Sequence, residues 1–129
     1  LVLTLLLVSL TMSLTAQTQK KTNGRQITVY ATAYTPSPKE NGGYKTTATG
    51  GKLTSLVGKC IAVDPRVIPL FSRVYIPGYG MFTALDTGGA IKGRRIDVLL
   101  ASRSQTSKFG RRKLTITVYP RETKGNKKK

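Results

Sequence analysis

The apolar residues of this chain occur in short runs separated by glycine and proline, and this pattern limits the fold more than any other feature of the sequence. Apolar and polar residues alternate over residues 26–31 and again over residues 113–118, a period of two that is typical of half-buried β-strands. Further short apolar runs lie between them, at residues 60–63, 74–76, 81–85 and 96–100. No stretch has the periodicity of an amphipathic helix longer than about two turns. The sequence therefore predicts an all-β domain, and the spacing of the runs fits a sandwich or a small barrel.

The 129 residues provide for about one domain with an extension at each end. Residues 1–16 begin with an almost unbroken apolar run and end in small and polar residues, which predicts a secretory signal peptide. Residues 17–25 are expected to form a linker, 26–120 the β domain and 121–129 a basic disordered tail.

The apolar run of the leader is short for a membrane span, so we expect a secreted, extracytoplasmic protein with no stable membrane insertion after signal cleavage. An uncleaved anchor and a buried N-terminal helix or strand are the alternatives. No Met or basic segment precedes the run, so its start is expected to be missing or to have been translated from another codon.

The chain is strongly basic, with 22 Lys and Arg against 5 Asp and Glu and a formal net charge of +17. Such a surface favours polyanionic partners, which include nucleic acid, anionic lipid and an anionic cell wall. Export disfavours nucleic acid, and the chain lacks the interleaved aromatic residues and recognition motifs of nucleic-acid-binding proteins. We therefore expect anionic cell-wall polymers as partners, in the cell wall or periplasm, and no nucleic acid.

The chain has one cysteine and no histidine. Cys60 cannot form an intrachain disulfide, and within the apolar run 60–63 it is expected to be a small buried residue and not a catalytic thiol. Without histidine, the Ser/His/Asp and Cys/His nucleophile systems and the usual zinc hydrolase sites are excluded. Any catalysis must therefore use carboxylates, hydroxyls, Lys, Arg or Tyr.

Three of the five acidic residues fall within or at the end of predicted strands, where aspartate is unfavourable. Asp64 precedes Pro65 and Asp86 precedes a Gly-rich segment, so each could be a turn residue that accepts backbone N–H bonds. Asp97 stands alone in the apolar run 96–100, which implies that its carboxylate is desolvated or paired and its pKa perturbed. A buried ion pair with a nearby Lys or Arg is the structural alternative. We predict that the three aspartates form one acidic site.

Five motifs in a fixed order resemble the 3D domain, a family named for three aspartates. They are residues 62–65 (AVDP), 67–70 (VIPL), 74–80 (VYIPGYG), 84–93 (ALDTGGAIKG) and 95–98 (RIDV). The resemblance covers nearly all of residues 27–119. It implies a six-stranded double-psi β-barrel, as in small secreted members of the family and the related catalytic barrel of membrane-bound lytic transglycosylases. Two positions depart from the pattern, because Phe71 replaces a common glycine and Phe109 a frequent tryptophan.

The resemblance also implies roles for single residues. Asp97 corresponds to the catalytic acid/base of the family, Asp86 to its supporting aspartate and Asp64 to the third aspartate. Lys92 matches the lysine of the motif and is expected to stabilise Asp86 or the substrate. Tyr34 and Glu40 lie where relatives have loop residues that line the substrate groove.

Gly88 and Gly89 lie in a turn of small residues that follows Asp86. The absence of bulky side chains would let a polymer approach the backbone closely, so both glycines are expected to contact substrate. A turn built for its geometry alone is the alternative.

The activity that the resemblance implies is non-hydrolytic cleavage of the β-1,4 bond between N-acetylmuramic acid and N-acetylglucosamine in peptidoglycan glycan strands, with a 1,6-anhydromuramyl end as product. One aspartate serves first as acid and then as base, so no metal, cofactor or nucleophilic side chain is required. Asp97 must then be protonated near neutral pH, which burial and repulsion from Asp86 would favour. A non-catalytic wall-binding or wall-loosening module of expansin-like type is the alternative, because a fold does not determine a function.

Overall fold

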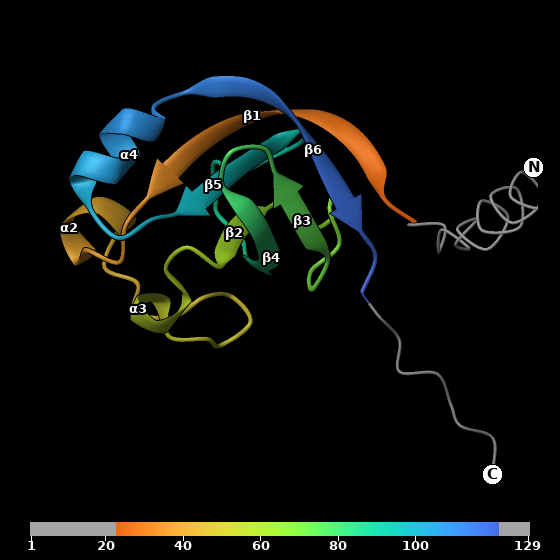
Figure 1. Ribbon diagram of the computed structural model, residues 1–129. Helices are drawn as coiled ribbons and strands as arrows, with labels where there is room; N and C mark the ends of the chain where they lie inside the picture. Colours follow the sequence, from red (N-terminus) through yellow and green to blue (C-terminus); the bar gives the residue numbers. More distant parts are fainter. Residues whose placement is uncertain (1–22, 122–129) are drawn as a thin grey trace, which may run out of the picture.

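The computed structural model describes residues 23–121 and shows a closed β-barrel of six strands (Figure 1). The strands are β1 (Arg25–Tyr34), β2 (Cys60–Val63), β3 (Arg73–Ile76), β4 (Gly80–Asp86), β5 (Arg95–Leu99) and β6 (Arg112–Tyr119). The helices among these residues are all short: α2 (Pro38–Asn41), α3 (Leu53–Leu56) and α4 (Arg103–Phe109). Each predicted apolar run forms a strand, which confirms the all-β prediction. The predicted signal peptide, most of the linker and residues 122–129 of the predicted tail lie outside the described residues.

The strands follow the order β1-β5-β2-β4-β3-β6 around the barrel. β1 pairs with β5 and β2 with β4 in parallel, and the other neighbours are antiparallel. β5 lies between β1 and β2, and β2 lies between β5 and β4, so each half of the chain forms one ψ-shaped motif. Exchanging β1–β3 with β4–β6 leaves every neighbour relation unchanged. This arrangement is the predicted double-psi β-barrel.

Aliphatic side chains fill the barrel interior, and they alternate with outward-facing residues along the strands. In β5, Ile96 and Val98 are fully buried in the core, whereas Asp97 between them is half-buried. Successive side chains of a strand point to opposite faces, so Asp97 lies on the outer face of the barrel. The same alternation turns Ala62 of β2 outward. Burial of the inward residues is the main stabilising contribution to the fold.

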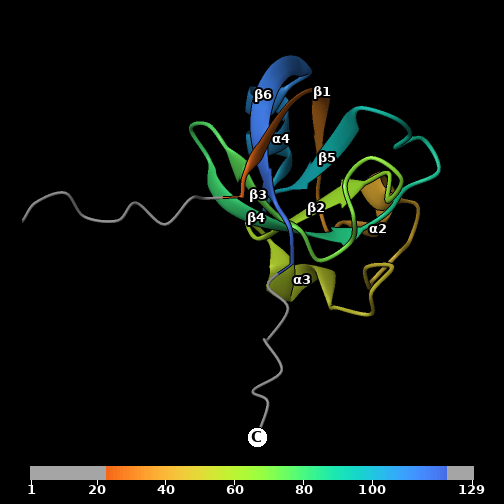
Figure 2. The same ribbon diagram turned by 90° about the vertical axis from the view of Figure 1, so that its right-hand side faces the viewer.

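A smaller apolar cluster attaches α3 to the outside of the barrel. Leu53, Cys60 and Leu99 are buried in it, and Tyr34 and Leu85 pack against it. In Figure 1 the helices lie on the left of the barrel and both ends of the described chain lie on the right, and Figure 2 looks from those ends toward the helices. The cluster therefore fixes α3 against one outer face of the barrel.

The two departures from the family pattern have different structural effects. Phe71 is the one non-glycine residue with a positive φ among residues 23–121, at 70°, a conformation that costs an L-residue about 1–2 kcal/mol. Its ring is partly exposed and lies 4.7 Å from the guanidinium carbon of Arg121. Phe109 is buried and packs edge-on against Tyr79, with ring centroids 5.0 Å apart. Phe71 thus strains a turn, whereas Phe109 fills its place in the core.

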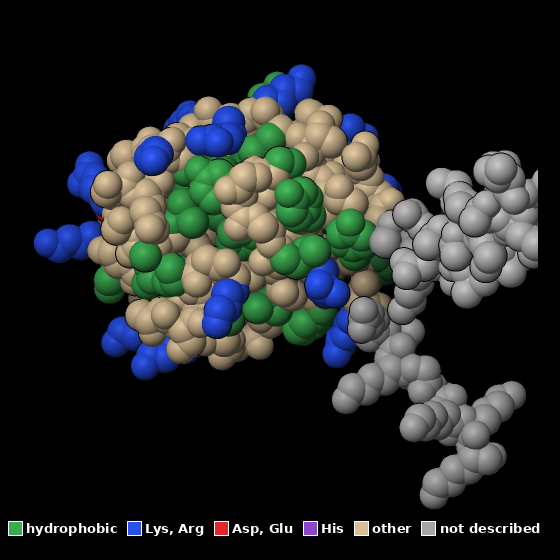
Figure 3. Space-filling model, in the orientation of Figure 1, with side chains coloured by type: hydrophobic (Ala, Val, Ile, Leu, Met, Phe, Trp, Pro, Cys, Tyr) green, Lys and Arg blue, Asp and Glu red, His purple; other side chains and the backbone are tan. Residues whose placement is uncertain are grey.

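Basic side chains are distributed over the surface. In the view of Figure 3, Lys and Arg side chains lie mostly around the outline of the molecule, and hydrophobic side chains gather nearer its centre. None of the helices in residues 23–121 is long and apolar enough to cross a lipid bilayer.

Candidate active site

One row of residues crosses four neighbouring strands and brings two of the predicted aspartates together. Thr32 of β1 pairs with Asp97 of β5, Asp97 pairs with Ala62 of β2, and Ala62 pairs with Asp86 of β4. Residues directly opposite one another share a face of the sheet. Neighbouring strands are about 4.8 Å apart, so the backbones of Asp97 and Asp86 lie about 10 Å apart. The methyl group of Ala62 leaves the space between the two carboxylates open.

A pocket of about 680 Å³ opens over this row. It is lined by seven of the predicted site residues, namely Tyr34, Glu40, Asp86, Gly88, Gly89, Lys92 and Asp97. They come from the ends of β1 and β4, from α2, from β5 and from the segment that follows β4. Residues 23–121 contain no group of three or more His, Cys, Asp or Glu side chains that could hold a metal ion.

Asp97 is half-buried at the junction of β1 and β5. Burial raises the pKa of its carboxyl group above the ordinary value, and the nearby charge of Asp86 acts in the same direction. A hydrogen bond from the Thr32 hydroxyl to Oδ1, at 3.0 Å, and the positive charge of Arg95 oppose this rise in pKa. No ion pair of Asp97 is formed among the described residues, so the alternative of a buried ion pair does not hold. The net shift favours the protonated acid.

Asp86 is held in place by three hydrogen bonds. The Tyr34 hydroxyl donates to Oδ2 at 2.8 Å, and the backbone N–H groups of Ala48 and Thr87 donate to Oδ1 at 2.9 Å each. Lys92 lines the same pocket, but within residues 23–121 it forms no ion pair with Asp86. Asp86 is therefore a fixed acceptor that ties β4 to the loop that contains Ala48.

Tyr34 and Cys60 are the neighbours of Asp86 on the side of the α3 cluster. Burial raises the pKa of the Tyr34 hydroxyl well above its ordinary value, and Cys60 and Asp86 add to the rise. Tyr34 is thus a neutral donor. Burial also raises the pKa of the Cys60 thiol to about 11. Cys60 is fully buried, so it is the small buried residue that the sequence predicts.

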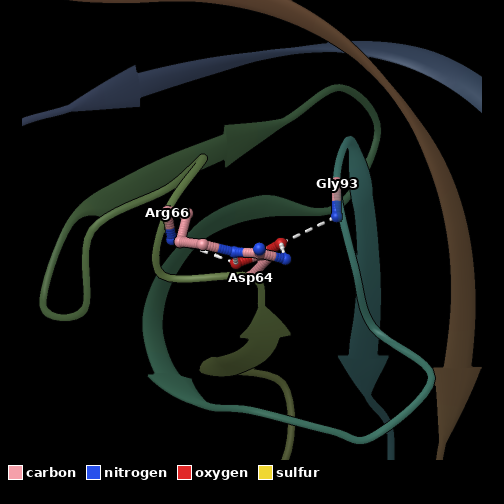
Figure 4. A network of polar contacts seen from close by, with 3 residues as sticks. All are labelled: Asp64, Arg66 and Gly93. Carbon is pink, nitrogen blue, oxygen red and sulfur yellow. Dashed lines mark hydrogen bonds and ion pairs between the residues drawn. The ribbon is translucent and has the colours of Figure 1, made fainter.

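Asp64 does not line the pocket, contrary to the prediction of one site with three carboxylates. Its side chain is 2% exposed and faces Arg66, whose Nε and Nη2 donate to it at 3.1 and 2.8 Å (Figure 4). The backbone N–H groups of Arg66 and Gly93 donate to it at 3.0 and 2.8 Å. The hydrogen bonds from Arg66 and then those from the backbone hold the pKa of Asp64 well below its usual range. Asp64 is a turn residue that anchors the end of the 87–93 segment.

The two glycines of that segment differ. A Cβ atom on Gly88 would lie 2.9 Å from Cγ1 of Ile91, whereas a Cβ atom on Gly89 would meet nothing within 4 Å. Local packing thus requires Gly88, which agrees with the alternative that this turn is glycine-rich because of its geometry. Gly89 is exposed and leaves the backbone open to an approaching ligand.

Tyr44 and Ala62 line the pocket and are not among the predicted site residues. The Tyr44 ring is 71% exposed, and a flat aromatic ring at the rim of a polar pocket is suited to pack against a sugar face. In the sequence, an aromatic residue directly after Gly42 and Gly43 was the signal that could have identified Tyr44 as a site residue. Ala62 gave none, because its role depends on strand register.

Residues 59–120 match the 3D domain family. The chain is 46% identical over 104 residues to cell wall-binding protein YocH of Bacillus subtilis (strain 168), a match that covers 80% of this chain and 36% of YocH. It is 43% identical over 99 residues to the putative cell wall shaping protein YabE of the same organism, covering 76% of this chain and 24% of YabE. The chain thus spans about a third or less of the length of these relatives.

Among solved structures, the crystal structure of MltA from Escherichia coli is similar at 20% identity and a TM-score of 0.47, over 60% of this chain and 28% of that chain. The family match covers the segment that contains Asp64, Asp86 and Asp97. Residues 59–120 of this chain are therefore a 3D domain.

Proposed function

We propose that this protein is a lytic transglycosylase that cleaves the β-1,4 bond between N-acetylmuramic acid and N-acetylglucosamine in peptidoglycan. The observation that carries the proposal is the pairing in one open pocket of Asp97, whose pKa is raised, with Asp86, a fixed hydrogen-bonded carboxylate. The family of the chain and the cell-wall names of YocH and YabE support the substrate class.

In the first step, protonated Asp97 donates its proton to the glycosidic oxygen, and the bond between that oxygen and C1 of the muramyl residue breaks. The muramyl ring acquires positive charge as the leaving group departs. Asp86 lies across the gap above Ala62 and stabilises this charge electrostatically. Three hydrogen bonds to its oxygens hold it in position for this role.

In the second step, the Asp97 carboxylate accepts the proton of the muramyl C6 hydroxyl while that oxygen bonds to C1. The product is the 1,6-anhydro sugar, and Asp97 is protonated again. Thr32 occupies Oδ1, so Oδ2 is the oxygen that transfers the proton. No water molecule enters the balance of the reaction.

Peptidoglycan as substrate requires an extracytoplasmic location, in the cell wall or periplasm, after export by the predicted leader. The net charge of +17 would attract the protein to anionic wall polymers. That attraction depends on ionic strength and raises the local concentration of enzyme at the wall without selecting a bond.

The test is digestion of purified peptidoglycan, followed by mass spectrometry of the soluble products. We expect anhydromuramyl ends from the wild type and a loss of at least about 100-fold in rate for Asp97→Asn, because acid/base catalysis contributes about 10²–10⁴-fold. The melting temperature of Asp97→Asn should equal or exceed that of the wild type at neutral pH, since the change removes a half-buried ionisable group. Near wild-type turnover by Asp97→Asn would overturn the assignment.

A non-catalytic wall-binding module is the second candidate, and the name of YocH, a cell wall-binding protein, favours it. In that case the wild type would sediment with purified walls but release no anhydromuramyl product. The same digest therefore separates the two functions.

A further inference from the structure

A second cavity, of about 670 Å³, lies on the β1 side of Asp97. It is bounded by Thr32 and Ala33 of β1 and by Thr106 and Ser107 of α4. Four basic side chains line it, and we call it the cationic cavity: Lys39, Arg95, Arg103 and Arg111. Lys39 lies in α2, Arg95 in β5 and Arg103 at the start of α4, and Arg111 lies between α4 and β6.

The acidic residues of the cationic cavity do not neutralise it. Two carboxyl groups, those of Glu40 and Asp97, face its four basic side chains. Glu40 accepts a hydrogen bond from the Thr35 hydroxyl and lies 4.0 Å from Nε of Arg103. The four basic side chains therefore leave an excess of positive charge even when both carboxyl groups are ionised.

Two of those cations, Lys39 and Arg111, have no partner in the part of the chain that the structure describes. Among residues 23–121, the side chains of Lys39 and Arg111 form no hydrogen bond and no ion pair, and both residues are exposed. Arg and Lys side chains arranged around a hollow bind carboxylate or phosphate groups. The cationic cavity thus has an unmet capacity for an anion.

The cationic cavity and the pocket over Asp86 share Tyr34, Glu40 and Asp97 as a common wall. A group in the cationic cavity therefore lies beside the carboxylate that acts on the scissile bond. If a glycan strand occupies the pocket, the anion must belong to a substituent of a sugar at that bond. In peptidoglycan the muramyl residue carries such a substituent, the stem peptide with its free carboxylates.

We propose that the cationic cavity binds a carboxylate of the stem peptide on the muramyl residue at the cleavage point. This inference rests on the proposed function, because it takes peptidoglycan as the polymer in the pocket. The site makes the protein prefer glycan that still carries its peptides. An anionic wall polymer that is not part of the glycan strand is the competing occupant, and it has no reason to lie within reach of Asp97.

The test compares two pairs of charge-removing changes in the catalytically inactive Asp97→Asn protein. Lys39→Gln with Arg111→Gln empties the cationic cavity of its unpaired charges. Lys59→Gln with Lys108→Gln is the matched control, because both lysines are exposed and line neither cavity. The ligand is a soluble glycan fragment with uncross-linked stem peptides, used either as isolated or with its carboxylates converted to methylamides. Calorimetry measures Kd at low salt.

We expect the Lys39/Arg111 pair to raise Kd about 5- to 10-fold for the free carboxylate ligand, which is about 1–1.4 kcal/mol for the loss of two exposed ion pairs. For the methylamide ligand, the two double variants should have equal Kd values. An equal rise in Kd with the Lys59/Lys108 pair would mean general attraction to a basic surface and would overturn the proposal. A second result would also overturn it. In that result polyglycerol phosphate binds more tightly than the glycan fragment and its binding depends on Lys39 and Arg111, whereas binding of the stem carboxylates does not.

The digest of wall peptidoglycan keeps this inference separate from the proposed function. If binding depends on the carboxylates but the wild type releases no anhydromuramyl product, the proposed anion site stands and the proposed catalysis fails. Anhydromuramyl product with identical Kd values for all variants would retain catalysis and reject the cationic cavity. Melting temperatures within a few degrees of the wild type verify that each variant is folded.

Discussion

Asp64 directly follows β2 and Asp97 lies within β5, and their surroundings shift their pKa values in opposite directions. Asp64 is the first residue after β2, where the chain turns, and Arg66 and backbone N–H groups are its hydrogen-bond partners. Asp97 lies inside a strand whose backbone groups are already paired, so its main neighbour is the hydroxyl of Thr32. Position relative to the strand end therefore decides whether the carboxylate anchors a turn or remains available for proton transfer.

Asp64→Asn should destabilise the protein in a pH-dependent way. The folded-state pKa of Asp64 lies below its unfolded value, about 3.9, so its contribution to the free energy of unfolding is present above that pH and lost as the pH falls. We expect a lower melting temperature for Asp64→Asn than for the wild type at pH 7, and a difference that shrinks below about pH 4. A deficit that is the same at pH 7 and pH 3 would contradict the ion-pair argument.

At Phe71 we expect glycine to be more stable than alanine, the reverse of the usual order. Phe71→Gly removes the left-handed strain of about 1–2 kcal/mol, whereas the added freedom of glycine in the unfolded chain costs about 0.5–1 kcal/mol. Phe71→Ala keeps the strain and loses the ring beside Arg121. Urea denaturation should give Phe71→Gly a free energy of unfolding about 1 kcal/mol above that of Phe71→Ala. The opposite order would show that the turn is not strained.

At the scale of the elements, one β-bulge determines whether the two carboxylates meet. The register of β2 with β4 shifts between Ile61 and Ala62, so Ala62 pairs with Asp86 and not with Leu85. A shift of one residue moves a strand's side chains to the other face. The period-two pattern predicts β2 and β4 correctly, but a bulge has no mark in that pattern. The row from Thr32 to Asp86 could therefore not be derived from the sequence.

The loop between α2 and α3 carries the strongest prediction at this scale. The N–H group of Ala48 donates to Asp86, so the loop is fixed over the pocket with Tyr44 exposed at the rim. Tyr44→Ala should raise Kd for glycan about 5- to 10-fold, from the loss of about 1–1.5 kcal/mol of ring contact. Tyr44→Phe should keep the wild-type affinity.

The matched control for Tyr44 is Tyr30→Ala. Tyr30 is 63% exposed and lines neither cavity, so its loss should leave Kd unchanged. Equal effects of the two alanine variants on glycan binding would mean that exposed tyrosines act as general sticky surface, and that Tyr44 has no special place in the site.

At the scale of the whole molecule, the sequence predicts the features that depend on local residue patterns. The strands follow from alternation and from Gly and Pro punctuation, and the motif order of the family brings Asp86, Asp97 and the loop residues to one pocket. The prediction was wrong for Asp64, because a motif does not specify which partner a side chain faces. The cationic cavity was also beyond the sequence, since its residues come from α2, β5 and the α4 segment and meet only in the closed barrel.

The exchange of β1–β3 with β4–β6 has a consequence for the polarity of the substrate. The exchange maps Asp97 onto Ala62 and Thr32 onto Asp86, because the pair Thr32 and Asp97 becomes the pair Asp86 and Ala62. A glycan strand has two unlike ends, and a groove lined by two equivalent halves would accept it in either direction. Here one half supplies an acid where the other supplies a methyl group. Under the proposed function, this asymmetry distinguishes the two directions of a glycan strand, because only one half of the barrel places a carboxyl group at this position.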